Sequence, residues 1–565
     1  MFGLTSSFLL LSIALLPASS SFQESRETGP AAPISAALFD ELELLYPDSS
    51  AAGGSSVLHS DSPQGVPVAV HLLIHGLHPA RGPLQLSVRD GADLVSKARW
   101  FRLLDVPVEE NTGLGSRTEQ FEGKRNPFVV RRAPFRVYEA FLPIQPPLEA
   151  AGPRQALRLE IPVEPNASPG RRLYRIDIHQ GNRRLCLHWQ VEVHEVLIPP
   201  AGRNSLYYTN WFNPVDMAGR HGVEPWSEAF WPILADYAKT MADGRQNTFW
   251  LRWADFFYLS EEGTPALRES RLQKYIEVFQ QAGLYWLEGA PLARRPGGDW
   301  SSPILELNVV KVPATGVAGQ KALATMLGSL HAFLDRHQLT ERWLQHLADE
   351  PTDTNAADYR KLAQQVRRHL PGVRLVEATM SRELAGALDI WCPQVHRFQQ
   401  NRAFFERRKA EGESIWVYTC LVPGGPWLNR LLDQERLRPV YVGWAAAKYD
   451  LDGFLHWGLN HYKADPFQQS VVDHPAQPKT KNKLPAGDTH ILYPGPEGPL
   501  NSQRFAAHRI GLEDHEMLRR LKKRNPQQAA DLLQGAFRAF DDYEKDVSRY
   551  REIRRSLLQA LASSF

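Results

Sequence analysis

The feature that most constrains the fold is an alternation of short apolar strands with helical segments, which begins near residue 203. Such an alternation predicts a parallel sheet. Eight units match a (β/α)8 TIM barrel, whereas an open doubly wound sheet is disfavoured because no Gly-rich phosphate turn follows the first strand. The strand candidates are residues 206–210, 248–251, 284–287, 342–347, 374–378, 387–391, 414–418 and 453–457.

Three further segments flank the barrel region, residues 203–483. Residues 35–198 contain many short, partly alternating apolar stretches punctuated by Pro and Gly, which predict an N-terminal β-sandwich. Residues 1–22 join an apolar run to small residues, the pattern of a secretory signal peptide. Residues 484–565 hold one short strand and charged helices, and we expect a small helical C-terminal extension packed on the barrel. A chain of 565 residues is long enough for several domains.

Composition and charge restrict the partners and the compartment. The formal net charge is +2, which gives no case for nucleic acid as a partner. No stretch after the N-terminus is long and apolar enough for a transmembrane helix, so we expect a secreted or periplasmic protein. The three cysteines do not form a disulfide framework; Cys392 and Cys420 follow neighbouring strands and are either a disulfide or two buried thiols. The oligomeric state stays open.

The leading candidate for chemistry is the carboxylate pair Asp349–Glu350, at the end of the fourth predicted barrel strand. Barrel enzymes work at the C-terminal ends of their strands. Like charges this close cannot both ionise freely, so the pKa of one carboxyl should rise, which suits a general acid. Pro351 predicts an extended backbone at Glu350 and an abrupt exit from the strand. Without that position, Asp-Glu is only a common surface dipeptide.

Aromatic and polar residues gather near the other predicted strand ends. A sugar site needs flat stacking faces together with convergent hydrogen-bonding groups. One such Trp alone is more commonly a core residue, but a ring of them around a carboxylate pair favours a glycosidase. The candidate substrate contacts are Arg245, Asn247, Trp391, Trp416, Tyr418, Trp457, Asn460 and Tyr462.

Competing chemistries find little support. The chain has no G-x-S-x-G elbow, no H-E-x-x-H motif, no Walker loop and no G-x-G-x-x-G turn. His346 and His456 are conceivable metal ligands, but single His residues in strands are more commonly core groups. We therefore expect neither a metal nor another cofactor.

Five motifs, in the expected order, resemble glycoside hydrolase family 123, the β-N-acetylgalactosaminidases. They are residues 237–247, 346–351, 453–462, 487–495 and 509–516. The N-terminal β region also fits the domain order of this family. The resemblance implies an exo-acting hydrolase whose substrate is a glycan with a terminal β-linked 2-acetamido sugar. It also implies that the motif at residues 509–516 is structural, a helix that locks the end of the barrel.

The resemblance further implies substrate-assisted retention, in which the acetamido oxygen of the sugar attacks the anomeric carbon and gives an oxazolinium intermediate. Asp349 would then orient the acetamido N–H and stabilise the positive charge. Glu350 would protonate the leaving oxygen and afterwards activate water. Tyr418 is the candidate to hold the acetamido carbonyl, and Asn247 and Trp457 are the favoured sugar contacts.

One departure from the family pattern leaves the sugar open. Gly244 stands where many relatives are expected to have His, and a His that touched the sugar would bear on the preference for galactosamine. Arg294, Arg295 and Trp300, in the loop after the third strand, motivate an alternative substrate, a sulfated or acidic 2-acetamido glycan. A second alternative is a glycan-binding protein without catalysis.

Overall fold

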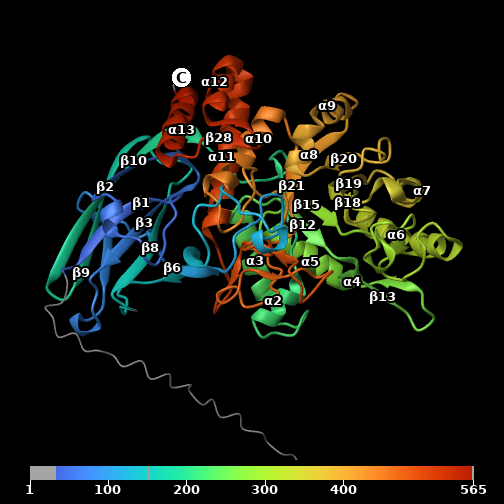
Figure 1. Cartoon of the computed structure of the whole chain (residues 1–565), viewed down its shortest axis with the longest axis horizontal. Helices are drawn as coiled ribbons and strands as arrows, with labels where there is room; N and C mark the ends of the chain where they lie inside the picture. Colours follow the sequence, from blue (N-terminus) through green and yellow to red (C-terminus); the bar gives the residue numbers. More distant parts are fainter. Residues whose placement is uncertain (1–32, 151, 563–565) are drawn as a thin grey trace, which may run out of the picture. The chain divides into compact units, whose positions relative to one another are not determined.

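The computed structural model describes residues 33–150 and 152–562, so the expected signal peptide, residues 1–22, lies outside the described residues. The N-terminal part is a β-sandwich of two five-stranded sheets (Figure 1). One sheet has the order β1 (Ser35–Asp40), β3 (Pro67–His75), β8 (Arg154–Pro162), β6 (Arg99–Val108) and β7 (Phe135–Ile144). The other has the order β2 (Val57–Gln64), β10 (Arg183–Leu197), β9 (Gly170–Gln180), β4 (Gln85–Asp90) and β5 (Asp93–Leu94).

Side-chain alternation explains why these residues form a sandwich. In β9, Tyr174, Ile176 and Ile178 are buried, while the residues between them are more exposed. A strand with one face on a core and one toward water has this period of two. The buried face packs against Trp189 of β10 and the apolar residues of β3 in one continuous core. The sandwich predicted from residues 35–198 is therefore confirmed.

The second part is an eight-stranded parallel barrel, as the sequence predicts. Its order is β11 (Tyr207–Asn210), β22 (Gly453–His456), β21 (Ser414–Thr419), β20 (Ile390–Cys392), β19 (Arg374–Ala378), β18 (Trp343–Gln345), β15 (Trp286–Gly289) and β12 (Thr248–Leu251). Between the two ends of this series, the N–H of Asn247 donates to the carbonyl of Tyr208 at 3.4 Å, so the barrel is nearly closed. All four residues of β12 are buried, which is typical of a strand covered on both faces.

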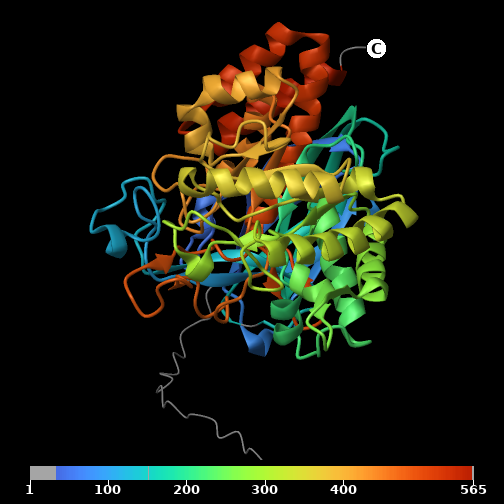
Figure 2. The ribbon, with the colours of Figure 1, turned by 90° about the vertical axis from the view of Figure 1, so that its right-hand side faces the viewer.

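Helices cover the outside of the barrel, and α6 and α7 pack side by side there (Figure 2). The helices of the barrel region are α2 (Pro214–Arg220), α3 (Phe230–Asp243), α4 (Trp253–Phe256), α5 (Glu269–Gln281), α6 (Val317–Arg336), α7 (Ala356–His369), α8 (Val395–Gln400), α9 (Arg402–Ala410) and α10 (Leu437–Tyr449). The C-terminal part forms α11 (Gln503–Arg524), α12 (Pro526–Ala536) and α13 (Val547–Ala562), which confirms the helical extension. Among the described residues, no helix has the length and hydropathy needed to cross a bilayer.

Helix α7 follows directly from its sequence and carries a side chain to the barrel end. Just before it, the side chain of Asn355 accepts the backbone N–H of Thr352 at 2.9 Å, which satisfies a backbone N–H group near the start of the helix. Tyr359, Leu362 and Val366 recur at helical spacing and are all buried. The first of them, Tyr359, thereby points from the helix toward the strands.

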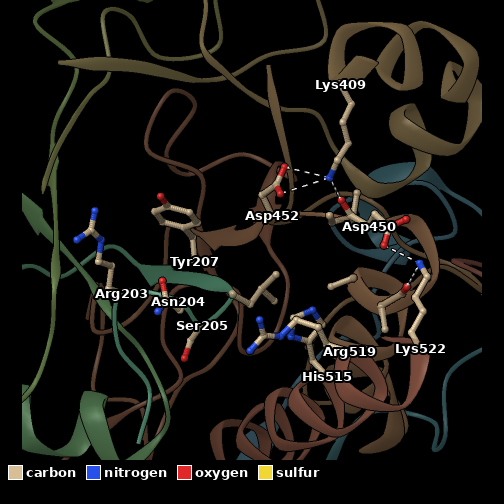
Figure 3. Close-up of a pocket in the computed structure, with 14 residues that line it drawn as sticks. Arg203, Asn204, Ser205, Tyr207, Lys409, Asp450, Asp452, His515, Arg519 and Lys522 are labelled. Atoms are coloured by element: carbon tan, nitrogen blue, oxygen red, sulfur yellow. Dashed lines mark hydrogen bonds and ion pairs between the residues drawn. The ribbon is translucent and has the colours of Figure 1, made fainter. Parts of the chain in front are cut away.

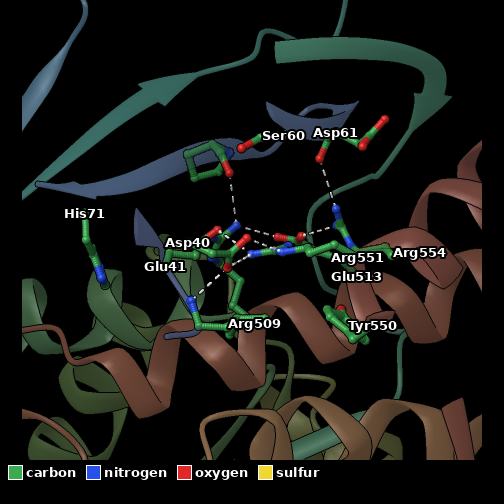
Figure 4. A network of polar contacts seen from close by, with 12 residues as sticks. Asp40, Glu41, Ser60, Asp61, His71, Arg509, Glu513, Tyr550, Arg551 and Arg554 are labelled. Carbon is green, nitrogen blue, oxygen red and sulfur yellow. Dashed lines mark hydrogen bonds and ion pairs between the residues drawn. The ribbon is translucent and has the colours of Figure 1, made fainter. Parts of the chain in front are cut away.

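Helix α11 joins the sandwich to the barrel, because it contacts both β7 and α10. Arg509 of α11 lies near Glu41 of the sandwich and pairs with Glu513 at 2.5 Å, and Arg554 of α13 pairs with both Glu513 and Asp514 (Figure 4). Removing one partner from such a buried network leaves a charge without compensation. The expected locking role of residues 509–516 agrees with this arrangement.

Candidate active site

Asp349 and Glu350 lie just beyond the C-terminal end of β18, at the end of the barrel where its enzymes act. The connecting residues stay tied to β15 and its continuation. The N–H of His346 donates to Gly289 at 3.1 Å, and the N–H of Ala293 donates to Leu347 at 2.9 Å. The side chain of Asp349 is exposed and that of Glu350 is partly exposed, so both reach the open end of the barrel.

The backbone of Glu350 is left-handed, with φ of 48°, so the extended conformation predicted from Pro351 is wrong. A non-Gly residue there costs about 1–3 kcal/mol unless its surroundings hold it. Arg295 holds it, because one of its terminal nitrogens donates to the carbonyls of both Asp349 and Glu350 at 2.7 Å each. Tyr418 adds a hydrogen bond from its hydroxyl to the Glu350 carboxylate.

The surroundings of the pair favour the acid form of Glu350. Burial of this side chain among protein atoms and the charge of Asp349 together raise its pKa to about 7, and the Tyr418 hydrogen bond and the charge of Arg295 oppose this rise. The pKa of Asp349 is also raised, because the surrounding protein disfavours its charged form, and the charges of Arg295 and His346 oppose the rise. A carboxyl that titrates near neutral pH suits proton transfer in both directions.

Directly beneath the pair, His346 lies between two buried carboxylates. Its Nε2 is 2.8 Å from Glu288 of β15 and its Nδ1 is 3.2 Å from Glu377 of β19. Burial alone would lower the pKa of His346, but the two carboxylates raise it to about 9. The imidazole is therefore a cation at neutral pH, and its charge limits the rise in the pKa of Asp349.

Glu377 also positions the chain that carries the pair. Its Oε2 accepts the backbone N–H of Leu347 and of Ala348, each at 3.0 Å, and the hydroxyl of Tyr359 at 3.0 Å. These are the last two peptide groups before Asp349. Sequence reasoning missed both Glu288 and Glu377. Each is an acidic residue near the C-terminal end of an otherwise apolar strand, and this pattern could have identified both as candidates for the site.

Three aromatic side chains stand at the same end of the barrel. Trp211 and Trp457 are partly exposed and pack, with buried Tyr418, against the inner core of the barrel. Trp211 stacks on Trp250 with ring centroids 4.0 Å apart and donates to Glu288 at 3.1 Å. Trp457 donates to the buried carboxylate of Asp488 at 3.2 Å. Of the predicted substrate contacts, Tyr418 and Trp457 thus lie with the pair, and Trp211 joins them.

Arg245 and Asn247 do not lie with the pair, because they precede β12 and so occupy the N-terminal end of the barrel. Asn247 is fully buried and bonds to the backbone of Leu206 and Tyr208, and Arg245 donates to Pro199 at 2.9 Å. A Cβ at Gly244 would lie 2.1 Å from the ring of Phe505. The prediction that Arg245 and Asn247 bind sugar is therefore wrong. The absence of a side chain at Gly244 makes room for Phe505 and is unrelated to the sugar.

Four other predicted contacts are internal to the fold. Trp391 is fully buried, packs on Phe404 and Phe405 of α9, and donates to Glu413 at 2.6 Å. Trp416 is fully buried beside Tyr207. The prediction that these two Trp residues contact sugar is wrong, because the ring of each is packed in the core.

Asn460 and Tyr462 follow β22 on the correct side of the barrel, but they too are buried. Asn460 brackets the backbone of Asn213, with bonds of 2.7 Å and 2.9 Å, and the Tyr462 hydroxyl donates to Leu492 at 3.0 Å. Both side chains hold the loops behind the site in place. The prediction that they contact the substrate directly is therefore wrong, and their role is to support those loops.

The remaining titratable groups do not suggest a metal. His456 accepts from Arg430 at 2.8 Å, and His346 is engaged by its two carboxylates. In residues 33–150 and 152–562, no group of three or more His, Cys, Asp or Glu side chains is arranged to hold a metal ion. Cys392 and Cys420 are buried free thiols, so the disulfide alternative is excluded.

A cavity of about 350 Å³, lined in part by charged side chains, lies elsewhere, at the N-terminal ends of β11 and β22 (Figure 3). Lys409 pairs there with Asp452, and Lys522 pairs with Asp450 at 2.6 Å. Lys522 also donates to the carbonyl of Ala447, near the C-terminus of α10. These cations neutralise nearby acids and a helix end, so the cavity has no group comparable to the Asp349–Glu350 pair.

Comparisons with known proteins agree with this geometry. Residues 301–521, which include Asp349 and Glu350, match the family model described as glycoside hydrolase 123, catalytic domain. A search of curated proteins gives no match. The structure is similar to that of a family 123 glycoside hydrolase from Clostridium perfringens, described for glycolipid glycan hydrolysis, with a TM-score of 0.69 and 11% identity over 94% of this chain and 97% of that one.

An endo-β-1,4-mannanase from Thermotoga petrophila is much less similar, with a TM-score of 0.35 and 8% identity over 56% of this chain and 77% of that one. The likeness to the family 123 structure covers the sandwich and the barrel together, and the match to the family model includes strands β18 to β22 of the barrel and most of helix α11. Residues 301–521 thus match the catalytic domain of glycoside hydrolase family 123, and on this match the chain is a glycosidase.

Proposed function

We propose that the enzyme removes terminal β-linked 2-acetamido sugars, with N-acetylgalactosamine as the first candidate, by substrate-assisted catalysis with retention of configuration. The observation that carries this proposal is the adjacency of Asp349 and Glu350 at the open barrel end, together with the pKa of about 7 for Glu350. Glycosidases whose substrate supplies its own nucleophile need one proton donor and one group that orients the acetamide.

In the first step, protonated Glu350 donates its proton to the glycosidic oxygen as the bond from that oxygen to the anomeric carbon breaks. The acetamido oxygen attacks the same carbon and forms the oxazolinium ring. Asp349 accepts a hydrogen bond from the acetamido N–H and stabilises the positive charge of the ring. In the second step, ionised Glu350 takes a proton from water as that water opens the ring at the anomeric carbon.

The neighbouring acids support this division of roles. A retaining enzyme with its own nucleophile places a second carboxylate about 5–5.5 Å from the acid. Glu288, Glu377 and Asp488, three carboxylates at this end of the barrel, are fully buried, and the first two are paired with His346. They are poorly placed to attack a sugar, which favours the acetamido group of the substrate as the nucleophile.

Tyr418 is suited to the acetamido carbonyl in one protonation state of the pair. Its hydroxyl donates to Glu350, and this bond is worth most when Glu350 is ionised. When Glu350 carries its proton, the Tyr418 hydroxyl is free to donate to the acetamido oxygen. We propose that Tyr418 serves both states, and that Trp211 and Trp457 supply the stacking faces for the sugar ring.

The experiment is hydrolysis of nitrophenyl β-glycosides of N-acetylgalactosamine and N-acetylglucosamine by wild type, Glu350→Gln and a control, Glu341→Gln, which alters an exposed acid near the other end of β18. We expect release of nitrophenol by wild type and by the control, and loss of most activity in Glu350→Gln. A folded wild type that is inert on both glycosides would refute the proposal.

We also propose that the protein is exported, on the basis of the apolar and small residues in positions 1–22. N-terminal sequencing of protein recovered from the periplasm or medium tests this directly. A mature chain that begins near residue 22 is expected, and an intact Met1 in a cytoplasmic fraction would contradict it.

A further inference from the structure

One loop at the open end of the barrel holds an aromatic face that the proposed chemistry does not use. It connects β16 (Ala293–Arg294) to β17 (Glu306–Leu307). Trp300 in this loop is 53% exposed, more than any other Trp in the chain, and the guanidinium of Arg295 lies 3.8 Å from its ring centre. An exposed indole backed on one side by a cation keeps its second face available for a ligand.

Arg295 fixes this aromatic face relative to the reaction centre. The same side chain that stacks on Trp300 donates to the carbonyls of Asp349 and Glu350, both at 2.7 Å. The indole therefore stands one side chain away from the pair. It belongs to the rim rather than to the inner core, on which Trp211 and Trp457 pack.

No salt bridge of Arg295 is found among the described residues, although its charge lowers the pKa values of the nearby Asp349 and Glu350. Its neighbour Arg294 pairs with Glu306 at 2.9 Å, whereas the hydrogen bonds of Arg295 go to backbone carbonyls, and its Nε is buried without a partner. Neutral carbonyls do not cancel a full positive charge, and Glu350, with a pKa of about 7, is protonated in the reactive state, so the pair compensates Arg295 only in part. A guanidinium with donors to spare recognises carboxylate and sulfate groups well.

We propose that Trp300 and Arg295 form the subsite for the leaving-group sugar, and that this sugar carries a carboxylate or sulfate group. The pyranose stacks on the free face of Trp300, and its anionic substituent faces Arg295. This inference rests on the proposed function, because it takes Glu350 as the group that protonates the oxygen between the two sugars. It specifies the substrate as an acidic glycan with a terminal 2-acetamido sugar.

The test compares three substrates with the same terminal sugar: its β-glycosyl fluoride, which lacks a second sugar, a disaccharide with a neutral leaving sugar, and a disaccharide with a uronic acid in that place. We expect Trp300→Ala to lower kcat/KM for both disaccharides about tenfold, the scale of one aromatic stacking contact, and to leave the fluoride unchanged. Ile304→Ala, at an exposed position of the same loop, is the matched control and should change none of them.

The charge preference is measured as the ratio of kcat/KM for the acidic disaccharide to kcat/KM for the neutral one. A ratio is needed because Arg295 also holds the reactive pair in place. Wild type should favour the acidic over the neutral disaccharide about tenfold, the scale of one charge-assisted hydrogen bond, and Arg295→Gln should bring the ratio to one. The ratio cancels any general loss from misplacement of Glu350. A wild-type ratio of one, or an equal loss in Trp300→Ala on the fluoride and the disaccharides, overturns the inference.

A binding measurement separates this inference from the proposed function. Calorimetric titration of Glu350→Gln with the acidic disaccharide, with and without Trp300→Ala, needs no turnover. Binding that weakens about tenfold in the double variant supports the subsite even if wild type hydrolyses none of the substrates. Equal binding by both variants refutes the subsite even if wild type is active.

Discussion

The hydroxyl of Tyr418 donates a hydrogen bond to Oε1 of Glu350, the carboxyl whose pKa lies at about 7. Burial and the charge of Asp349 raise this pKa, and the Tyr418 bond lowers it. The acid form of Glu350 at neutral pH is therefore a balance between opposing effects, which substitution can shift in a stated direction.

The first prediction concerns the pH dependence of wild type. The glycosidic oxygen needs a proton from Glu350, so the first step requires the protonated form, which dominates below the pKa and disappears above it. We expect kcat/KM for a disaccharide to fall as the pH rises through about 7. A profile that stays flat up to pH 9 would contradict this assignment of the acid.

The second prediction concerns Tyr418→Phe. Loss of the hydroxyl removes a bond that favours ionised Glu350, so the pKa of Glu350 should rise and the alkaline fall in kcat/KM should move to higher pH. The maximal rate should also drop, since the acetamido oxygen loses a donor. A shift of the alkaline limb to lower pH would be incompatible with the observed contact.

The third prediction concerns His346→Gln. The folded pKa of about 9 exceeds the ordinary value of 6.5, so the charged imidazole stabilises the fold fully below pH 6.5, and this contribution is lost as the pH rises through about 9. The shift corresponds to at most roughly 3 kcal/mol. Denaturant unfolding at several pH values should show a difference between wild type and His346→Gln that shrinks from pH 6 to pH 9.5. A difference independent of pH would mean that His346 is neutral.

The fourth prediction concerns the N-terminal end of the barrel. Gly244→Ala forces a Cβ to within 2.1 Å of the Phe505 ring, and overpacking of this kind costs about 1–3 kcal/mol. Thermal unfolding should occur at lower temperature, while the ratio of activities on the galactosamine and glucosamine glycosides stays as in wild type. A changed ratio would show that this position senses the sugar after all.

The sequence predicts the barrel and the position of the pair at a strand end for a physical reason. Every strand of a parallel barrel is buried on both faces, so short apolar runs between amphipathic helices mark it, and the run at β18 leads directly to Asp349. The error at Asn247 has an equally simple cause. This residue precedes its strand, so it must lie at the end of the barrel opposite to Asp349, which follows one.

The rest depends on distances that spacing along the chain does not reveal. Glu288 and Glu377 converge on His346 from strands β15 and β19, which the barrel places on either side of β18. The left-handed backbone of Glu350 depends on Arg295, a residue 55 positions earlier. Local preference at Pro351 favoured an extended residue, and this tertiary contact overrides it.

The central claim is that the acetamido group of the substrate is the nucleophile. Its most direct test is kcat for aryl β-glycosides whose acetamido methyl carries zero, one, two or three fluorine atoms, since each fluorine weakens the carbonyl oxygen as a nucleophile. The account predicts a steep, stepwise fall in kcat across the series. A kcat that stays constant from the acetamido to the trifluoroacetamido substrate would contradict it and would assign the nucleophile to the enzyme.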